Sequence, residues 1–300
     1  MRYHELYTSG ELLARVRGAY SWLRSCNLCP HSCGVDRLSG KLGFCQAGVR
    51  PKIASANIHL GEEPPISGTG GSGTIFFSHC TLRCRFCQNF PISQMGNGSE
   101  TTISGLAAHM LKLQRQGAHN VNFVTPGHYL PQILAALWLA IPQGFGLPLV
   151  WNSSGYELAD VLTILEGVVD IYLPDMKYSD EEPANLFSAA PGYPEYNRGA
   201  VREMLRQVGH LDLDEAGLAV RGLIIRHLVL PGGVAGSRET VSWIAENLGV
   251  ETHIALMNQY FPAYQAEETA GIGRKITVAE YDEAVEALEE YGLECGWVQE

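Results

Sequence analysis

Six short apolar runs, separated by segments of helical periodicity, restrict the fold of this chain more than any other feature. The runs are rich in β-branched and aromatic residues, as expected for strands that are covered on both faces. They occupy residues 73–77, 120–124, 147–151, 168–173, 222–230 and 252–257. Helices are predicted at 104–116, 131–141, 157–165, 180–207, 237–247 and 278–291. This alternation is typical of parallel β/α units, so we expect functional side chains at the carboxyl ends of the strands.

The first 72 residues lack this alternation and contain half of the eight cysteines. We therefore expect two regions, an N-terminal cysteine-rich and loop-rich segment (1–72) and a β/α domain (73–300). Four of the cysteines would complete the coordination shell of a metal centre: Cys26, Cys29, Cys33 and Cys45. The spacing does not choose between structural zinc and a second 4Fe-4S cluster, His31 is an alternative ligand, and small buried thiols are the alternative to any metal. Cys295 stands alone and is predicted to be a partly buried thiol.

A second cysteine group, Cys80, Cys84 and Cys87, follows the first predicted strand with the spacing CxxxCxxC. Three thiolates so close together suit an iron–sulfur cluster, and because a 4Fe-4S cluster takes four ligands, one iron is left open to a substrate or cofactor. A structural zinc site is the less favoured alternative. Zinc sites usually close with a fourth ligand at a short paired spacing, whereas the nearest candidate, His79, directly adjoins Cys80.

This cysteine run resembles the signature of the radical S-adenosylmethionine (radical SAM) superfamily. The resemblance implies that the open iron chelates S-adenosylmethionine, and that the reduced cluster cleaves it to a 5′-deoxyadenosyl radical that abstracts hydrogen from a substrate. The superfamily's partial (β/α)6 barrel carries the motif in the loop after its first strand, where it also stands here. We therefore predict an α/β fold, a partial (β/α)6 barrel with an N-terminal cysteine-rich extension.

Residues after the second and third runs are similar to cofactor-binding positions of the superfamily. Thr125 and Pro126 stand where many members carry a Gly-Gly-Glu turn, and the resemblance implies that their carbonyls bind the cofactor's ammonium, although the Glu is lacking here. Asn152 and Ser154 lie in a stretch that resembles the Asp-Thr-Asn-Gly sequence of glycyl-radical-activating enzymes, which implies contact with the cofactor ribose. The alternative for this stretch is an ordinary Asx or Ser turn that caps the next helix.

The fourth run ends in Asp175-Met176-Lys177, similar to the Asp-Xaa-Lys motif of the same activating enzymes. There the Lys is implicated near the cofactor carboxylate, and the Asp near a monovalent cation or the ribose. The alternative is a solvated ion pair, which is a poor fit directly after a buried strand. In the fifth run Arg226 and His227 alternate faces, so one of them points into the barrel, and an inward Arg226 would bind a carboxylate bidentately.

Two other features carry weaker hypotheses. His128 follows the second strand and is either a catalytic acid or base or a turn residue with a solvated ring. Glu62 and Glu63 are predicted to be exposed charges rather than a catalytic pair.

The whole pattern is similar to pyruvate formate-lyase activating enzymes, which are radical SAM oxidoreductases. That resemblance implies a low-potential electron donor such as flavodoxin or ferredoxin, and a glycyl radical enzyme, another peptide or a small molecule as substrate. The alternative outside enzymes is a non-catalytic iron–sulfur electron carrier or a zinc-stabilised binding module. This alternative is less favoured because a carrier needs no barrel-like pocket.

Charge and hydropathy exclude several classes of partner. Lys and Arg total 21 against 32 Asp and Glu, a net charge of −11, and no dense basic block is present, so a nucleic-acid partner is not expected. The N-terminus does not resemble a signal peptide, and the longest apolar stretch, 133–141, is far short of the roughly 20 residues that span a bilayer. We expect a cytoplasmic protein without a membrane partner, in which cysteines bind metal rather than form disulfides.

Overall fold

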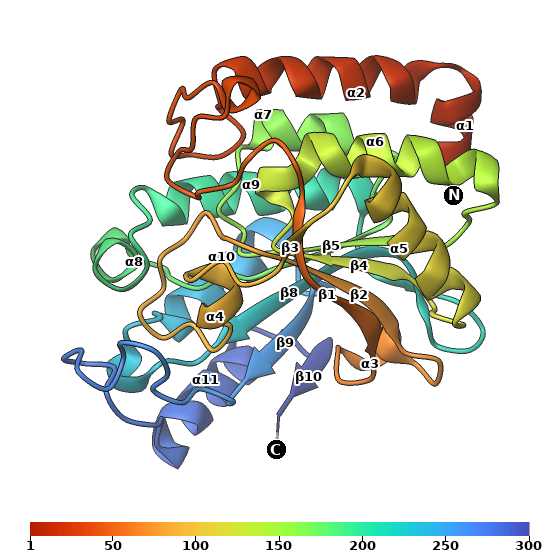
Figure 1. The fold of residues 1–300 in the computed structure, drawn as a ribbon. Helices are drawn as coiled ribbons and strands as arrows, with labels where there is room; N and C mark the ends of the chain where they lie inside the picture. Colours follow the sequence, from red (N-terminus) through yellow and green to blue (C-terminus); the bar gives the residue numbers. More distant parts are fainter. Residues whose placement is uncertain (300) are drawn as a thin grey trace.

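A computed structural model describes residues 1–299 as an open barrel of parallel strands with helices outside it (Figure 1). The strands of these residues are β1 (Lys52–His59), β2 (Ser72–Phe77), β3 (Ser99–Glu100), β4 (Val121–Val124), β5 (Leu149–Ser153), β6 (Ile171–Pro174), β7 (Asp212–Leu213), β8 (Ala219–Leu228), β9 (His253–Met257) and β10 (Gly296–Val298). They form one sheet in the order β10-β9-β8-β6-β5-β4-β2-β1-β3, with β7 paired to β8.

The six predicted runs are β2, β4, β5, β6, β8 and β9, which are neighbours in this order and all parallel. The predicted partial (β/α)6 barrel is therefore confirmed. It is not closed, because within the described residues the two ends of the strand order, β10 and β3, do not pair. Strand β1 is antiparallel to β2, so the sheet begins inside the segment 1–72. The boundary at residue 72 stays a prediction.

Helices cover the outer face of the sheet (Figure 1). The helices of the described residues are α1 (Tyr3–Thr8), α2 (Glu11–Ser21), α3 (Pro64–Ser67), α4 (Phe90–Ser93), α5 (Ile103–Arg115), α6 (Leu130–Ala140), α7 (Ala159–Leu162), α8 (Glu181–Ser188), α9 (Tyr193–Val208), α10 (Ser237–Leu248) and α11 (Val278–Glu290), of which the one-turn helices α3 and α4 are not part of the outer layer. The helix predicted over 180–207 is in fact two, because Ala189 and Gly192 adopt left-handed backbone conformations between α8 and α9. No helix in residues 1–299 is long and apolar enough to cross a membrane.

The N-terminal segment is less loop-rich than predicted. Helices α1 and α2 form a hairpin, and α2 lies along α6 on the outside of the barrel (Figure 1). Tyr3 and Leu12 are fully buried in this contact region. The extended loop of the segment is confined to the residues between α2 and β1, and it contains all four N-terminal cysteines.

Side chains inside the barrel divide it into a packed end and an open end. Apolar residues fill the end at which the parallel strands begin: Ile66, Val150, Ile171, Leu173, Ala219 and Ile224. Alternate residues such as Trp151 point outward into the layer of helices. Because these six apolar side chains fill the barrel toward the amino ends of the strands, free space is left toward the carboxyl ends, where the predicted site residues lie.

Candidate cluster and cofactor site

The loop after β2 carries Cys80, Cys84 and Cys87 and is held in an apolar enclosure. Cys80 and Cys84 are buried and Cys87 is partly exposed. The enclosure consists mainly of aromatic and aliphatic side chains: Leu82, Phe86, Tyr156, Tyr178, Phe187, Tyr193, Leu230, Tyr260 and Ile272. Backbone N–H groups of Arg83 and Arg85 donate to carbonyls at the end of α8, which fixes the loop against the barrel rim.

Each of the three sulfurs also has a polar neighbour. The N–H of Leu82 lies 3.3 Å from Cys80 Sγ, the Ser188 hydroxyl donates to Cys84 Sγ at 3.0 Å, and Ser93 Oγ lies 3.1 Å from Cys87 Sγ. Hydrogen bonds to sulfur are a usual means of tuning iron–sulfur clusters. The loop therefore supplies the thiols, and the loop, α4 and α8 supply their polar neighbours.

Burial and mutual repulsion oppose ionisation of these thiols. Burial, and after it the neighbouring Cys84 and Cys87 charges, raise the pKa of Cys80 to about 12. Burial likewise raises the pKa of Cys84 to about 11, although the Lys177 ammonium acts in the opposite direction. A bound cationic cluster would reverse this balance and hold the thiolates, because metal ions favour the ionised form of their ligands.

The donor set fits an iron–sulfur cluster better than a single metal ion. In residues 1–299 no three His, Cys, Asp or Glu side chains converge closely enough to enclose one ion. The ligands of a four-iron cluster bind separate iron atoms, so their sulfurs stand farther apart than those around one zinc ion. Three thiols in one loop, two of them buried and each beside a polar hydrogen-bonding group, are compatible with such a cluster.

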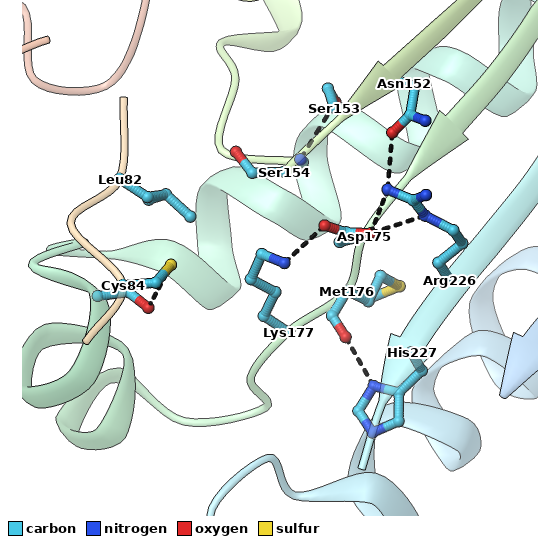
Figure 2. A network of polar contacts seen from close by, with 12 residues as sticks. Leu82, Cys84, Asn152, Ser153, Ser154, Asp175, Met176, Lys177, Arg226 and His227 are labelled. Carbon is cyan, nitrogen blue, oxygen red and sulfur yellow. Dashed lines mark hydrogen bonds and ion pairs between the residues drawn. The ribbon is translucent and has the colours of Figure 1, made fainter. Parts of the chain in front are cut away.

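Asp175, directly after β6, is the centre of a charged network beside this loop (Figure 2). Its Oδ2 accepts from Lys177 Nζ at 2.6 Å and its Oδ1 from Arg226 Nε at 2.9 Å. Burial would raise the pKa of Asp175, but Arg226 and Lys177 outweigh it and the pKa is lowered. Burial alone would lower the pKa of Lys177, whereas Asp175 and then Cys84 raise it. Both charges of the pair are therefore retained.

Arg226 points into the barrel and extends the network to β5. Its Nη2 donates to Asn152 Oδ1 at 2.7 Å. His227 points the other way, with Nδ1 2.6 Å from the Met176 carbonyl oxygen and Nε2 2.9 Å from Ser237 Oγ (Figure 2). The strand alternation predicted opposite faces, and the sheet register assigns the inner face to Arg226.

Two residues of α9 that the sequence analysis did not identify support the network from behind. The Tyr193 hydroxyl accepts from the Lys177 N–H at 3.0 Å and lies 3.1 Å from the Asp175 carbonyl oxygen. Asn197 Nδ2 donates to the same carbonyl at 2.9 Å. A tyrosine and an asparagine four residues apart on the buried face of a helix were the available signal.

The residues after β4 and β5 border the loop less directly. Thr125 has a positive φ of 56°, which is strained for a β-branched residue and is often found at functional sites. The Pro126 carbonyl accepts from the Tyr129 N–H at 2.8 Å, so it is already engaged in a turn. Ser154, Thr125, Thr81 and Cys29 together line a narrow space between the two cysteine loops. Whether these residues contact a cofactor stays a prediction.

Neither hypothesis for His128 describes its surroundings fully. The ring is buried rather than solvated, and Nε2 lies 2.9 Å from the Ser78 carbonyl oxygen. Burial lowers the pKa of His128 to about 3, so the ring is neutral. The side chain joins the turn after β4 to the end of β2, which is a structural role.

The prediction that Glu62 and Glu63 are exposed charges is wrong. The side chain of Glu62 is only 8% exposed, and both residues line a cavity that extends from the turn after β1 to residues near the carboxyl ends of β5, β8 and β9. The cavity has a volume of about 570 Å³ and also contains Asn152, Arg226, Met257 and Trp297 in its wall. The turn between β1 and α3 and the strand β10 close its sides, and the sequence analysis predicted neither element.

The N-terminal cysteines gather in the loop between α2 and β1. Cys26 and Cys45 are buried, Cys29 is partly exposed and Cys33 is exposed. Burial raises the pKa of Cys29 to about 12, and the charges of the other three cysteines raise it as well. A Cβ at Gly43 would overlap Cys33 Sγ, which explains the glycine at this position. The four residues are thus neighbours, and a metal among them stays a prediction.

The two cysteine loops touch through a polar contact of His31 with Thr81 and a cation–π contact of Arg83 with Phe44. His31 stacks on Phe44 with ring centroids 3.7 Å apart, and its Nε2 lies 2.8 Å from the Thr81 carbonyl oxygen. On the other side, the Arg83 guanidinium lies 5.0 Å from the Phe44 ring centroid. His31 is therefore engaged by the other loop through Nε2.

Known proteins were compared with this chain by family model, by structure and by sequence. No protein-family model matches the chain. Among solved structures, the chain is similar to HydG, a maturase of the FeFe hydrogenase, with a TM-score of 0.49 and 11% identity over 76% of this chain and 50% of HydG, so it spans half of that protein. It is also similar to TYW1 with a lysine-pyruvate adduct bound, with a TM-score of 0.42 and 14% identity over 72% of this chain and 73% of TYW1.

A sequence relative is closer than either structure. The chain is 32% identical to the uncharacterized protein MJ0674 of Methanocaldococcus jannaschii over 290 residues, which cover 93% of this chain and 79% of the relative. Identity at this level over nearly the whole chain shows common descent. The chain therefore belongs to the family of MJ0674.

Proposed function

We propose that this protein is a radical SAM enzyme. The observation that carries the proposal is the position of the loop with Cys80, Cys84 and Cys87, which follows the first parallel strand and lies beside the network of Asp175, Lys177 and Arg226. Three thiols, cationic side chains and a cavity thus meet in one part of the barrel. Parallel β/α proteins carry out chemistry at the carboxyl ends of their strands.

The three cysteines would hold a 4Fe-4S cluster, which when bound supplies one electron to S-adenosylmethionine, so that the 5′ C–S bond breaks and the resulting 5′-deoxyadenosyl radical takes a hydrogen atom from the substrate. Lys177, which lies between Asp175 and Cys84 in Figure 2, would bind the cofactor's carboxylate. Asp175 orients Lys177 and Arg226, and Asn152 offers an amide to a ribose hydroxyl. The Thr125 carbonyl is the candidate acceptor for the cofactor's ammonium.

The N-terminal cysteines belong to the same proposal as the ligands of a second centre. An iron–sulfur cluster is favoured over zinc, because the loop with Cys29 and His31 is in direct contact with the loop with Thr81 and would pass electrons to it. A low-potential carrier such as flavodoxin or ferredoxin would supply the electron. In this assignment the contact between the two loops serves electron transfer as well as packing.

Two classes of substrate are compatible with the proposed radical chemistry. Transfer of the radical to a glycine of a partner enzyme rests on the Asp175-Met176-Lys177 motif, which is similar to that of glycyl-radical-activating enzymes. Action on a small molecule rests on the enclosed cavity of about 570 Å³ beside the network, a volume in the usual range for small-molecule sites. The cavity favours the second class.

The test is anaerobic reconstitution with iron and sulfide, reduction with dithionite, and measurement of 5′-deoxyadenosine formed from S-adenosylmethionine, with iron and zinc counted in the same sample. We expect cleavage and about eight irons per chain, as two 4Fe-4S clusters require. About four irons with one zinc would make the N-terminal centre structural. No cleavage by a protein with an intact, reducible cluster would contradict the proposed function.

A further inference from the structure

The wall of the barrel cavity contains a carboxylate of which one oxygen has no hydrogen-bond partner among the described residues. Glu63 stands in the turn between β1 and α3, and its Oε2 is buried and receives no hydrogen bond from any described residue. Its neighbour Glu62 also lines the cavity, with Oε1 3.6 Å from His59 Nδ1. A buried oxygen without a donor is costly, so such groups in native proteins usually have a reason.

Arg226 does not act as the hydrogen-bond partner of Glu63 Oε2. Arg226 lines the same cavity, but its Nε and Nη2 donate to Asp175 and its Nη2 to Asn152. Burial raises the pKa of Glu63, and the opposing effect of Arg226 does not cancel it. The described wall of the cavity contains no Lys, and the hydrogen bonds of its one Arg go to Asp175 and Asn152, so no protein cation is bonded to Glu63 there.

A second unpartnered group lies below the cavity. Asn122 on β4 is fully buried, and neither its Oδ1 nor its Nδ2 has a hydrogen-bond partner among the described residues. It stands two residues before Val124, which lines the cavity, so both point to the inside of the barrel. A ligand or water that reaches the floor of the cavity would satisfy this amide.

From these observations we propose that the cavity binds a small molecule with a protonated amine or guanidinium group, which Glu63 holds with help from Glu62. The side chain of Trp297 in the same wall offers an aromatic surface to such a cation. With its cationic end at Glu63, the rest of the molecule extends toward Asn152 and Arg226, where the radical would form. The inference rests on the proposed function and names the substrate class for that site.

The experiment compares matched ligands on the reconstituted full chain with S-adenosylmethionine present. Isothermal titration calorimetry under anaerobic conditions uses butylamine against butanol and butylguanidine against butylurea, pairs that differ in charge but little in shape, with butyrate as the anion. We expect each cation to bind at least about tenfold more tightly than its neutral partner, a difference of about 1.4 kcal/mol. The ratio should approach one in Glu63→Gln and persist in Glu215→Gln, an exposed carboxylate in the turn after β7.

Three results would overturn the inference: neutral partners that bind as well as the cations, a preference for butyrate, or no preference for any member. A fall in S-adenosylmethionine affinity of Glu63→Gln equal to its loss of amine affinity would assign the carboxylate to the cofactor, and would also overturn it. The wild-type comparison does not depend on the variant's folding. Cleavage of S-adenosylmethionine, measured in the same samples, separates the two proposals: cleavage without a cation preference rejects only this inference.

Discussion

The two cysteine loops of this molecule contain the same kind of ligand in very different surroundings. The loop with Cys80 and Cys84 follows a central parallel strand, and both thiols lie in an apolar enclosure next to Lys177. The loop with Cys33 lies outside the barrel, on the side of α2, and Cys33 is exposed. The difference teaches that cysteine spacing alone says little about role, whereas the place of a cysteine loop relative to the strand ends indicates whether substrate chemistry can occur there.

The largest expected effect comes from replacing one cysteine in each loop and comparing the two variants. Cys84→Ala should reduce 5′-deoxyadenosine formation below detection, because one of three ligands at the strand ends is lost. Cys29→Ala should remove about four irons per chain but leave a cluster signal in electron paramagnetic resonance after dithionite reduction. Cys295→Ala is the matched control, since this cysteine belongs to neither loop. Intact cleavage by Cys84→Ala would remove the basis of the comparison.

The second prediction concerns the buried network of Asp175, Lys177 and Arg226 beside the barrel loop. Asp175→Asn leaves Arg226 and Lys177 buried without their shared carboxylate, and breaking a buried pair in this way costs about 3–5 kcal/mol. The free energy of unfolding, measured by anaerobic urea denaturation, should fall by that amount. Asp282→Asn, an exposed residue of α11, should change it little. Equal stability of the two variants would show that the network is not a structural part of the site.

The third prediction concerns the attachment of the N-terminal loop. Arg37 is buried, and its guanidinium donates to the carbonyl oxygens of His128 at 2.8 Å and Gly48 at 2.6 Å. Arg37→Met keeps most of the volume but loses both charged hydrogen bonds, so we expect a loss of about 3 kcal/mol in unfolding free energy. Arg24→Met, at an exposed arginine after α2, is the control. A loss no larger than that of the control would show that the loop is held by other contacts.

The same contrast explains how much could be predicted from the sequence. The six central strands and their order follow from apolar runs that are covered on both faces, and Asp175 and Arg226 were found because site residues collect at the ends of such strands. Local pattern and global fold agree there. The sequence predicted that Arg226 and His227 face opposite sides, but only the register of the sheet shows which of them points into the barrel.

What escaped the sequence analysis depends on contacts between distant parts of the chain. The edge strands β1 and β10 are short or half exposed, so their periodicity is weak, although together they close the sides of the cavity. The burial of Glu63 follows from that closure and has no local signal. Helix α2 packs on α6, more than a hundred residues later in the chain, and its own hydrophobic pattern is modest.

The smallest expected effect is a pH dependence at the junction of the two loops. His128 has a folded pKa of about 3, against an ordinary value of 6.5, so between these values the unfolded chain binds the extra proton. Stability should therefore fall as the pH is lowered from 6.5 toward 3, with a contribution from His128 of up to about 1.4 kcal/mol per pH unit. In His128→Gln this contribution should vanish, whereas His4→Gln on α1 should keep the wild-type slope. Urea denaturation at pH 7, 6 and 5 measures both, and parallel slopes in wild type and His128→Gln would show that the ring is not held neutral between the two cysteine loops.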